Sequence, residues 1–467
     1  MKRGIALSGG GTKGSYELGV WKALNELGID YQIVTGTSIG SINGALMATG
    51  DYDRAYELWS TITMEDMMED GINLTDTIEG MYDQREAIGP FLKKYVKNKG
   101  ADISPFTAFI ETLIEEDKIR KSKTDFGLVT VEFPSLKPCE LTKRDIPEGL
   151  MKDYILASSA IFPLFPMHKI GETTYLDGCY YDNLPIDLAI RMGAQQIIAV
   201  DLHTSPAHDA YAKRPYVTYI KPSRSLGTMM NFDHALLMAN ARMGYQDTMK
   251  VYGKYYGYVY TFEKESMEKY RRAMDHFLYR MTELDLLVRD EMPVKRFAKK
   301  SEFNKVHTLL AERSEKEKMS PREYFLAAAE ICGEVFDVDA AIEYSMEQFV
   351  ETLHKKLADA ELRQVTECII AHKLREPAGL IAEVKNFGKE MLVAAAAYYA
   401  AQQDTLTSKE ILKLYHDMGG KIITIGSDAH NADRIGDCVM ESQKILKDIG
   451  FDGIYTFEKM KPEFHRF

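Results

Sequence analysis

The sequence has no apolar run long enough to cross a membrane. Two apolar stretches without a charged residue, 154–168 and 391–403, are shorter than the roughly 18 apolar residues that a spanning helix needs. The chain begins with Met-Lys-Arg, but glycines soon interrupt the apolar residues that follow, which is not typical of a signal peptide. We therefore expect any contact with a membrane to be peripheral and transient.

Cysteine is scarce, and positive charge is not in excess. No two cysteines form a Cys-x-x-Cys pair, which argues against a redox motif or a zinc site and favours a reducing compartment. Lys and Arg total 58 against 70 Asp and Glu, a net charge of -12, which argues against a nucleic-acid partner. We expect a cytoplasmic protein whose contact with a membrane is peripheral. The five cysteines are Cys139, Cys179, Cys332, Cys368 and Cys438.

The first 50 residues alternate between the periodicities of strand and helix. Residues 4–7 are typical of a buried strand, and apolar residues then recur at helical spacing from Leu18 to Leu27. A second strand is predicted at 31–34 and a second helix at 39–49, with Gly28 and Gly50 ending the two helices. Two strand-to-helix units in succession predict a mainly parallel sheet in an α/β fold.

The 467 residues, 45% of them hydrophobic, are enough for two or three domains. Further strands are expected at 126–131, 173–176, 196–200, 217–220 and 255–262. We therefore predict an α/β domain over 1–262. Dense mixed charge at helical spacing and an alanine-rich segment predict a helical domain over 263–405, and strand and helix patterns predict an α/β tail over 406–467.

The segment Gly36-Thr37-Ser38-Ile39-Gly40 is a Gly-x-Ser-x-Gly pattern between a predicted strand and a predicted helix. This is the context of a nucleophile elbow, in which a sharp turn exposes a serine hydroxyl and glycines leave room around it. The following helix directs its amino-terminal dipole toward negative charge formed there. An ordinary Gly-Ser turn is the alternative interpretation.

A second loop, Ser8 to Gly14, has three consecutive glycines whose N–H groups can bind an anion. Gly9, Gly11 and Gly14 also satisfy the dinucleotide pattern Gly-x-Gly-x-x-Gly. The acidic residue expected at the end of the next strand is missing, and a Walker A loop is excluded because Ser15, not lysine, follows Gly14. An oxyanion hole beside an exposed serine explains both glycine loops together.

A serine nucleophile needs a proton acceptor. None of the eleven histidines lies in a motif of its own, and His168 is only a weak candidate. Asp177 is the better one, because it follows a predicted strand and precedes Gly178. Taken alone, an Asp-Gly pair indicates only a turn.

Four segments occur in order: SGGGTKGSYELGV, GTSIGSINGAL, ASSAIFPLFP and LDGCYYDNLP. Together they resemble the patatin-like phospholipase family. The resemblance implies a three-layer α/β/α sandwich and a lipid acyl hydrolase that uses a Ser-Asp dyad and no cofactor. It assigns Ser38 as nucleophile and Asp177 as base, together with an oxyanion loop. The other residues it assigns are Gly9, Gly10 and Gly11 as N–H donors, Lys13 and Gly14 as support for that loop, and Gly36 and Gly40 as the elbow glycines.

Cys179 departs from the family pattern, in which a small residue more often follows the Asp-Gly pair. Two apolar groups could serve an acyl-chain site. The residues Ile161, Phe162, Leu164 and Phe165 could line an acyl path or pack inside a loop. The methionines Met64, Met67 and Met68 could form a lid or fill the core.

The tail, with its Gly-Ser-Asp-Ala-His motif, resembles the end of the polymerase and histidinol phosphatase family. That resemblance implies Asp428 and His430 as metal ligands. A working multi-metal site begins with a His-x-His pair, which the chain lacks, so we expect no phosphatase site there. We interpret the tail as a fragment kept for packing or a product of gene fusion.

The sequence thus predicts a serine hydrolase acting on esters of phospholipids or related lipids. Two alternatives remain open. One is a lipid-binding or scaffolding protein that keeps the fold without the activity, with the region after residue 262 as its partner surface. The other is a nucleotide-binding oxidoreductase that uses the loop from Gly9 to Gly14.

Overall fold

The computed structural model describes residues 1–69, 101–271, 274–275, 277, 310–316, 318–357, 439–458 and 461–467. The chain divides into two units, Met1–Glu265 with Ala340–Ser345, and Ser266–Asp339 with Met346–Phe467. Each unit is described by itself.

The first unit is built on a sheet with the strand order β5-β6-β3-β2-β1-β7-β8, in which β4 also pairs with β3. The neighbours from β3 to β8 in this order run parallel, whereas β4, β5 and β6 join antiparallel. The strands are β1 (Arg3–Leu7), β2 (Ile33–Thr37), β3 (Asp125–Phe133), β4 (Pro138–Thr142), β5 (His168–Ile170), β6 (Thr173–Asp177), β7 (Gln196–Val200) and β8 (Val217–Ile220).

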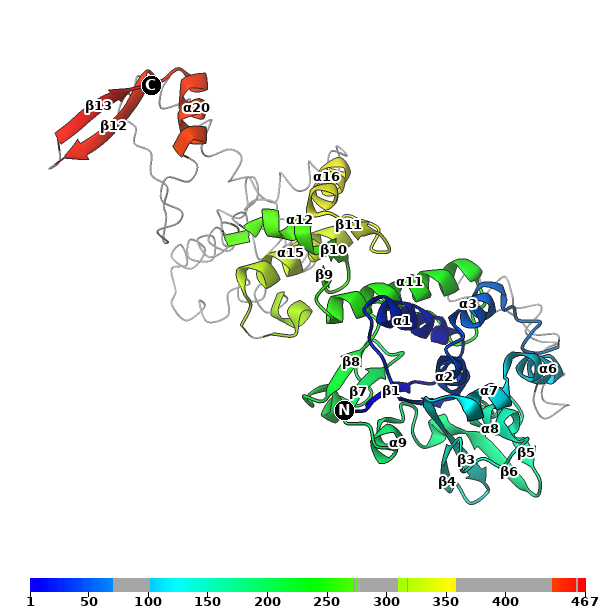
Figure 1. Cartoon of the computed structure of the whole chain (residues 1–467). Coiled ribbons are helices and arrows are strands. Elements are labelled where there is room, and N and C mark those ends of the chain that lie inside the picture. The colour runs from blue at the N-terminus through cyan, green and yellow to red at the C-terminus, as the bar shows by residue number, and fades with distance from the viewer. Residues whose placement is uncertain are drawn as a thin grey trace, which may run out of the picture. The chain divides into compact units, whose positions relative to one another are not determined.

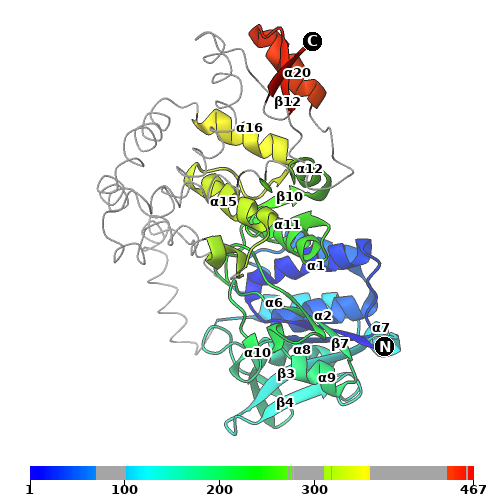
Figure 2. The same cartoon turned by 90° about the vertical axis from the view of Figure 1, so that its left-hand side faces the viewer.

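Helices cover both faces of this sheet. Ile5 and Leu7 of β1 point into a large core shared with the helices α1, α2, α3, α6 and α11, while Ala6 points to the opposite face and packs with α9. Figures 1 and 2 both show α1 and α9 on opposite sides of the strands. The predicted three-layer α/β/α arrangement with a mainly parallel sheet is confirmed. The helices are α1 (Ser15–Glu26), α2 (Ile39–Thr49), α3 (Tyr52–Thr61), α6 (Ser104–Leu113), α7 (Glu116–Lys121), α8 (Met151–Ser158), α9 (Ile186–Arg191), α10 (Asp209–Ala212) and α11 (His234–Val251), with 3-10 turns η1 (Gly11–Gly14) and η2 (Gly178–Tyr180).

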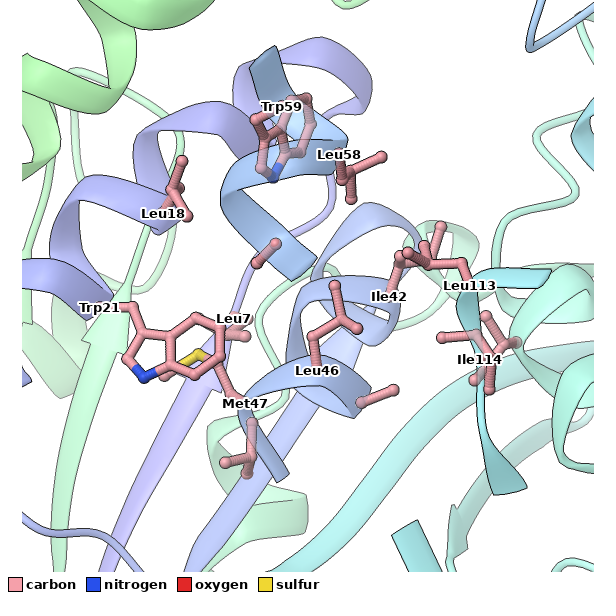
Figure 3. Packing of buried hydrophobic residues seen from close by; sticks show 14 of the residues in the cluster. Leu7, Leu18, Trp21, Ile42, Leu46, Met47, Leu58, Trp59, Leu113 and Ile114 are labelled. Carbon is pink, nitrogen blue, oxygen red and sulfur yellow. The ribbon is translucent and has the colours of Figure 1, made fainter. Parts of the chain in front are cut away.

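The larger core fills the space between the sheet and its first helices. Figure 3 shows Leu18 and Trp21 of α1, Leu46 and Met47 of α2, and Leu7 of β1 pointing into this interior. Each of these side chains is at most 3% exposed. Burial of this size is the main favourable contribution to the stability of an α/β domain.

Glycines let α1 and α11 pack with their backbones in contact. A Cβ at Gly19 would lie 1.7 Å from the carbonyl oxygen of Ala241, and one at Gly244 would lie 2.0 Å from that of Tyr16. The Tyr16 hydroxyl also donates to Asp247 at 3.2 Å. This close contact fixes α1, and with it the loop that precedes the helix.

Several strands end at the same level of the sheet. Leu7 pairs with both Gly36 and Val200, so β1, β2 and β7 end side by side. Thr37 pairs with Val129 of β3, and Asp177 pairs with the next residue, Thr130. The loops that follow β1, β2, β6 and β7 therefore meet at one edge, which is where α/β folds place their sites.

Most predicted strands of the first unit are present, and the helix at 39–49 has the predicted bounds. The prediction of one strand over 255–262 is wrong, because two short strands form there, β9 (Tyr255–Tyr256) and β10 (Thr261–Glu263). The strand β10 pairs with β9 on one side. On its other side it pairs with β11 (Glu343–Tyr344), which comes from a later part of the chain. The sequence analysis missed the short antiparallel strands β4 and β5.

In the second unit the described elements are α12 (Lys264–Lys269), which begins in the first unit, α15 (Pro321–Val335), α16 (Met346–Leu357), α20 (Val439–Ile449), β12 (Gly453–Glu458) and β13 (Lys461–Arg466). A capping box formed by Ser320 and Glu323 starts α15. The alanine-rich segment 391–403 and the residues Asp428 and His430 lie outside the described residues. The domain limits at 262 and 405 stay predictions.

Within the described residues, no helix is long and apolar enough to span a bilayer. The cysteines of the described part, Cys139, Cys179 and Cys332, are free thiols.

A carboxyl group lies buried where α1, α2 and α3 meet. Glu17 is 1% exposed, and its Oε2 accepts a hydrogen bond of 2.7 Å from Nδ2 of Asn43. Asn43 also donates to the carbonyl oxygen of Gly14 and accepts from the indole N–H of Trp59, both at 3.0 Å. Burial raises the pKa of Glu17 to about 8. The side chain is therefore protonated at neutral pH.

This raised pKa makes stability depend on pH. Between the unfolded pKa of about 4.3 and a folded pKa of about 8, the folded protein keeps a proton that the unfolded chain releases, so stability falls as pH rises through this range. We expect the unfolding temperature of the wild type to fall between pH 5 and pH 8 relative to that of Glu17→Gln, which has no proton to lose. Thermal unfolding followed by circular dichroism measures this. Equal pH dependence in the two proteins would contradict it.

Candidate active site

Ser38 occupies a strained turn between β2 and α2. Its φ is 55° and its ψ is -126°, and it is the N-cap residue of α2. Residues other than glycine rarely adopt a positive φ, and those that do are concentrated at functional sites. The two elbow glycines permit the turn, since a Cβ at Gly36 would lie 2.1 Å from the carbonyl oxygen of Gly40, and one at Gly40 would lie 2.6 Å from that of Leu7.

A second serine holds this turn in place. The Ser38 N–H donates to Oγ of Ser158 at 3.0 Å, and the Ser158 hydroxyl donates to the carbonyl oxygen of Val129 at 2.7 Å. Ser158 is fully buried at the end of α8. The sequence analysis did not identify it, because no local pattern distinguishes it from the serine that follows.

Asp177 ends β6 on the other side of β3 from Ser38. It is 1% exposed, and its Oδ1 accepts a hydrogen bond of 2.8 Å from the N–H of Cys179. Burial raises the pKa of Asp177 to about 6, while the Cys179 N–H and the Ser38 hydroxyl act in the opposite direction. The carboxyl group thus interacts with the Ser38 hydroxyl, and its pKa lies close to neutral pH, as suits a general base.

Gly178 brings these two segments together. A Cβ there would lie 2.3 Å from the carbonyl oxygen of Val129 and 2.9 Å from Cγ2 of Thr37. The next residue, Cys179, supports Asp177 through its backbone N–H, a bond that any residue except proline can make. Burial and the charge of Asp177 raise the pKa of the Cys179 thiol well above its ordinary value, so this thiol stays protonated and is a poor nucleophile.

The glycine loop after β1 is fixed by two neighbouring segments. The N–H of Gly9 donates to the carbonyl oxygen of Asn183 at 3.0 Å, and Nδ2 of Asn183 donates back to that of Gly9 at 3.1 Å. On the other side, the N–H of Thr12 donates to the carbonyl oxygen of Met229 at 3.0 Å. Asn183 is a further supporting residue that sequence analysis missed.

These bonds limit which N–H groups could bind an oxyanion. The Gly9 N–H already donates to the carbonyl oxygen of Asn183. This differs from the expectation that all three glycines donate to an oxyanion. Gly10 and Gly11 have no acceptor for their N–H groups in the described part of the chain. Gly11 has a φ of 60° and closely approaches the carbonyl oxygen of Met229, so no other residue fits there. Gly14 packs against Ile39 and Trp59.

Ser38, Asp177 and the glycine loop line one cavity of about 240 Å³. Its other walls are mainly apolar. The lining residues are Gly9, Gly10, Gly11, Thr12, Lys13, Ser38, Ile39, Ile42, Leu58, Trp59, Ile62, Met67, Phe106, Phe109, Ser159, Ile161, Leu164, Phe165, Asp177, Cys179, Asn183, Leu202, His203, Met229, Met230 and Phe232.

The apolar candidates of the sequence analysis divide between cavity and core. Ile161, Leu164 and Phe165 line the cavity, whereas Phe162 does not and is 41% exposed. Among the methionines, Met67 lines the cavity, while Met64 and Met68 are buried in the core.

Three histidines of the described residues pair with aspartates, His168, His203 and His208, and of these only His203 lines the cavity. His168 lies on β5 with its Nε2 3.1 Å from Oδ1 of Asp153, away from Ser38. His203 follows β7 and lines the cavity, with its Nδ1 2.8 Å from Oδ1 of Asp201. The sequence analysis did not single out His203, because only the sheet order brings it to this edge.

No group of three or more potential metal ligands occurs among the described side chains. The residues Asp428 and His430 lie outside them.

Comparison with known proteins identifies the class of this domain. Residues 5–190 match the family model "Patatin-like phospholipase". This N-terminal region of the chain is therefore similar to the patatin-like phospholipase family.

Two relatives match the same part of the chain. Human patatin-like phospholipase domain-containing protein 6 is 28% identical over 212 residues, which are 44% of this chain and 14% of that protein. Lysophospholipase NTE1 of Mycosarcoma maydis is 29% identical over 204 residues, 43% of this chain and 10% of that protein. The chain thus spans a small part of the length of these relatives. Among solved structures, VipD from Legionella pneumophila is 14% identical with a TM-score of 0.37, covering 88% of this chain and 90% of that one.

The support that Ser158 gives to the turn can be tested by Ser158→Ala. We expect ester hydrolysis to fall about tenfold, because the Ser38 N–H loses its buried acceptor and the nucleophile is held less firmly. A p-nitrophenyl butyrate assay measures the rate. The matched control is Ser314→Ala, which removes a buried serine hydroxyl that bonds Ala311 in the second unit. Equal rates for the two variants would contradict the prediction.

Proposed function

We propose that the N-terminal domain is a serine lipid acyl hydrolase that cleaves carboxylic esters of phospholipids or related lipids. Ser38 is the nucleophile and Asp177 the general base. The observation that carries the proposal is the meeting, at one apolar cavity, of a serine with a positive φ and a buried carboxyl group whose pKa lies near 6. The match of residues 5–190 to the patatin-like phospholipase model supports it.

In the first step Ser38 Oγ attacks the ester carbonyl while Asp177 takes the hydroxyl proton. The carbonyl oxygen becomes an oxyanion, which the N–H groups of Gly10 and Gly11 stabilise. When this intermediate collapses, the protonated Asp177 gives its proton to the departing alcohol. The product that remains is an acyl-enzyme on Ser38.

In the second step water attacks the acyl-enzyme, and Asp177 again accepts the proton. Collapse of the second tetrahedral intermediate releases the fatty acid and returns the proton to Ser38. The carboxylate alternates between base and acid in both steps, so one residue can perform all the proton transfers. A pKa of about 6 matches this double task better than that of an exposed aspartate.

The cavity walls favour an acyl chain over a polar substrate. Helices α2, α3 and α6 contribute Ile42, Trp59 and Phe106, and the loop after α8 contributes Phe165. Burying methylene groups against such walls is favourable by about 0.8 kcal/mol for each group.

We infer that the enzyme works in the cytoplasm with transient contact to a lipid surface.

Two substitutions test the dyad. Ser38→Ala should lower kcat/KM for a p-nitrophenyl ester by about 10³-fold or more, and Asp177→Asn by about 10²- to 10⁴-fold, since each removes a group that acts in the transition state. A fluorophosphonate probe should label the wild type but not Ser38→Ala.

The control variant is Asp153→Asn, which alters an aspartate outside the cavity that pairs with His168. Full activity in Asp177→Asn, or labelling of Ser38→Ala, would overturn the dyad. A wild type that neither reacts with the probe nor hydrolyses any ester would favour the lipid-binding alternative.

The dyad also predicts the pH dependence of catalysis. Asp177 must be ionised to accept a proton, and its pKa is raised to about 6, so kcat/KM should rise about tenfold per pH unit up to pH 6 and level off above it. The steady-state rate on a p-nitrophenyl ester between pH 4 and pH 9 measures this. A plateau that persists down to pH 4 would mean that an ordinary, exposed carboxylate acts as the base.

A further inference from the structure

The cavity beside Ser38 has an open side and a closed end. Two of its lining residues, His203 after β7 and Met229 before α11, are exposed to solvent. By contrast, Phe106 of α6 and Phe165 of the loop after α8 are 3% and 5% exposed. The cavity therefore opens beside β7 and ends against these two rings.

The rings of Phe106 and Phe165 contact each other at the closed end. They come from separate segments, since α6 lies against α8 and Phe165 follows that second helix. Their centroids are 5.7 Å apart and their planes are inclined by 49°. This separation falls within the roughly 4.5–7 Å that is typical of aromatic pairs in contact. An alkyl chain cannot pass between two rings in contact, so the pair blocks the cavity.

Backbone hydrogen bonds fix the loop of Phe165 relative to Asp177. The N–H of Phe165 donates to the carbonyl oxygen of Ile161 at 2.8 Å, which closes a turn. One residue earlier, the carbonyl oxygen of Ala160 accepts a hydrogen bond of 3.0 Å from the N–H of Asp177. The distance from the carboxyl group of Asp177 to the closed end is therefore set mainly by the backbone.

A third ring of the cavity wall is fixed as well. Trp59 of α3 is 1% exposed, and its indole N–H donates to Oδ1 of Asn43 at 3.0 Å. Asn43 lies on α2, the helix that Ser38 caps. Buried side chains at native packing density cannot move aside without strain. A wall of fixed rings does not yield to a longer chain, so it can discriminate between chain lengths.

The strand order places Ser38 between the open side and the two rings. Ser38 follows β2. On one side of β2 lies β7, and on the other lie β3 and β6, against which α8 packs. The two parts of a phospholipid ester differ, because the acyl chain is apolar along its length and the alcohol carries the polar head group. An ester held at Ser38 therefore directs its acyl chain toward the rings and its alcohol toward the open side.

We propose that Phe106 and Phe165 end the acyl site and set the longest acyl chain that the enzyme accepts. This inference rests on the proposed function and narrows its substrate class to esters whose acyl chain ends before the two rings. Up to that length, each methylene group adds apolar contact. Beyond it, a further methylene group meets the rings and has to displace buried side chains.

The test is the dependence of kcat/KM on acyl chain length. The substrates are p-nitrophenyl esters of the even-numbered saturated acids from butyrate to stearate, presented to the full chain in the same detergent micelles. For the wild type, kcat/KM should rise by up to about fourfold per methylene group, reach a maximum and fall for longer chains. The chain length at this maximum is the quantity that the variants should change.

Variants of the two rings should move the maximum in opposite directions. Phe106→Ala and Phe165→Ala should each move it to acyl chains longer by about four carbon atoms, because the deleted ring leaves space at the end of the cavity. Phe106→Leu should move it in the same direction by less, and it replaces the alanine variant where that one does not fold. Phe106→Trp should move the maximum to shorter chains.

The matched control is Ile110→Ala on the same helix. Ile110 is completely buried in the core, one turn from Phe106, and is not among the residues that line the cavity. This variant loses core packing but should keep the maximum of the wild type.

A maximum that stays in place in folded Phe106→Leu and Phe106→Trp, or that moves equally in Ile110→Ala, would overturn the inference while leaving the dyad intact. A wild-type rate that keeps rising up to stearate would overturn it as well. If the wild type hydrolyses none of these esters, the proposed function fails, and the chain-length limit fails with it.

Discussion

Direct contact between backbones at one edge of the sheet is the constraint on which the site depends. The elbow of Ser38, the loop before η1 and the turn after β6 approach so closely that no Cβ fits at Gly36, Gly40 or Gly178. The strand register sets this distance. The strands β1 and β2 are neighbours, β3 lies between β2 and β6, and β1, β2 and β6 end at the same level of the sheet. The geometry of the candidate site is therefore a property of the sheet, and the glycines are the residues that permit it.

Burial of Asp177 and its hydrogen bonds act in opposite directions on the same carboxyl group. Desolvation alone would keep it protonated at neutral pH, and it could not accept a proton from a serine. The N–H of Cys179 and the hydroxyl of Ser38 stabilise its ionised form. Glu17 shows the contrasting case, since its burial is offset less completely and its pKa lies near 8. Two buried carboxyl groups of one domain thus differ in their pKa, and Glu17 is the neutral partner of Asn43.

The residues that could be predicted are those that lie in a recognisable local sequence pattern. Ser38 and the glycine loop stand out because a tight turn needs glycines at fixed offsets, and the central parallel strands stand out because both faces are buried. Ser158, Asn183 and His203 carry no such local signal. Each reaches the site through a strand or helix from a distant part of the sequence, so only the strand order reveals it. The strands β4 and β5 were missed because they are short and mostly polar at the end of the sheet.

The glycine spacing that also fits a dinucleotide loop has a different explanation in the structure. In a dinucleotide-binding loop the second glycine leaves space for a pyrophosphate to approach the backbone. Here a Cβ at Gly11 would lie 2.2 Å from the carbonyl oxygen of Met229, and one at Gly14 would lie 2.6 Å from Cγ1 of Ile39. Protein atoms thus occupy the space beside both glycines. The loop packs against the protein at these positions and faces the cavity of Ser38, so the space that a pyrophosphate needs beside these glycines is filled.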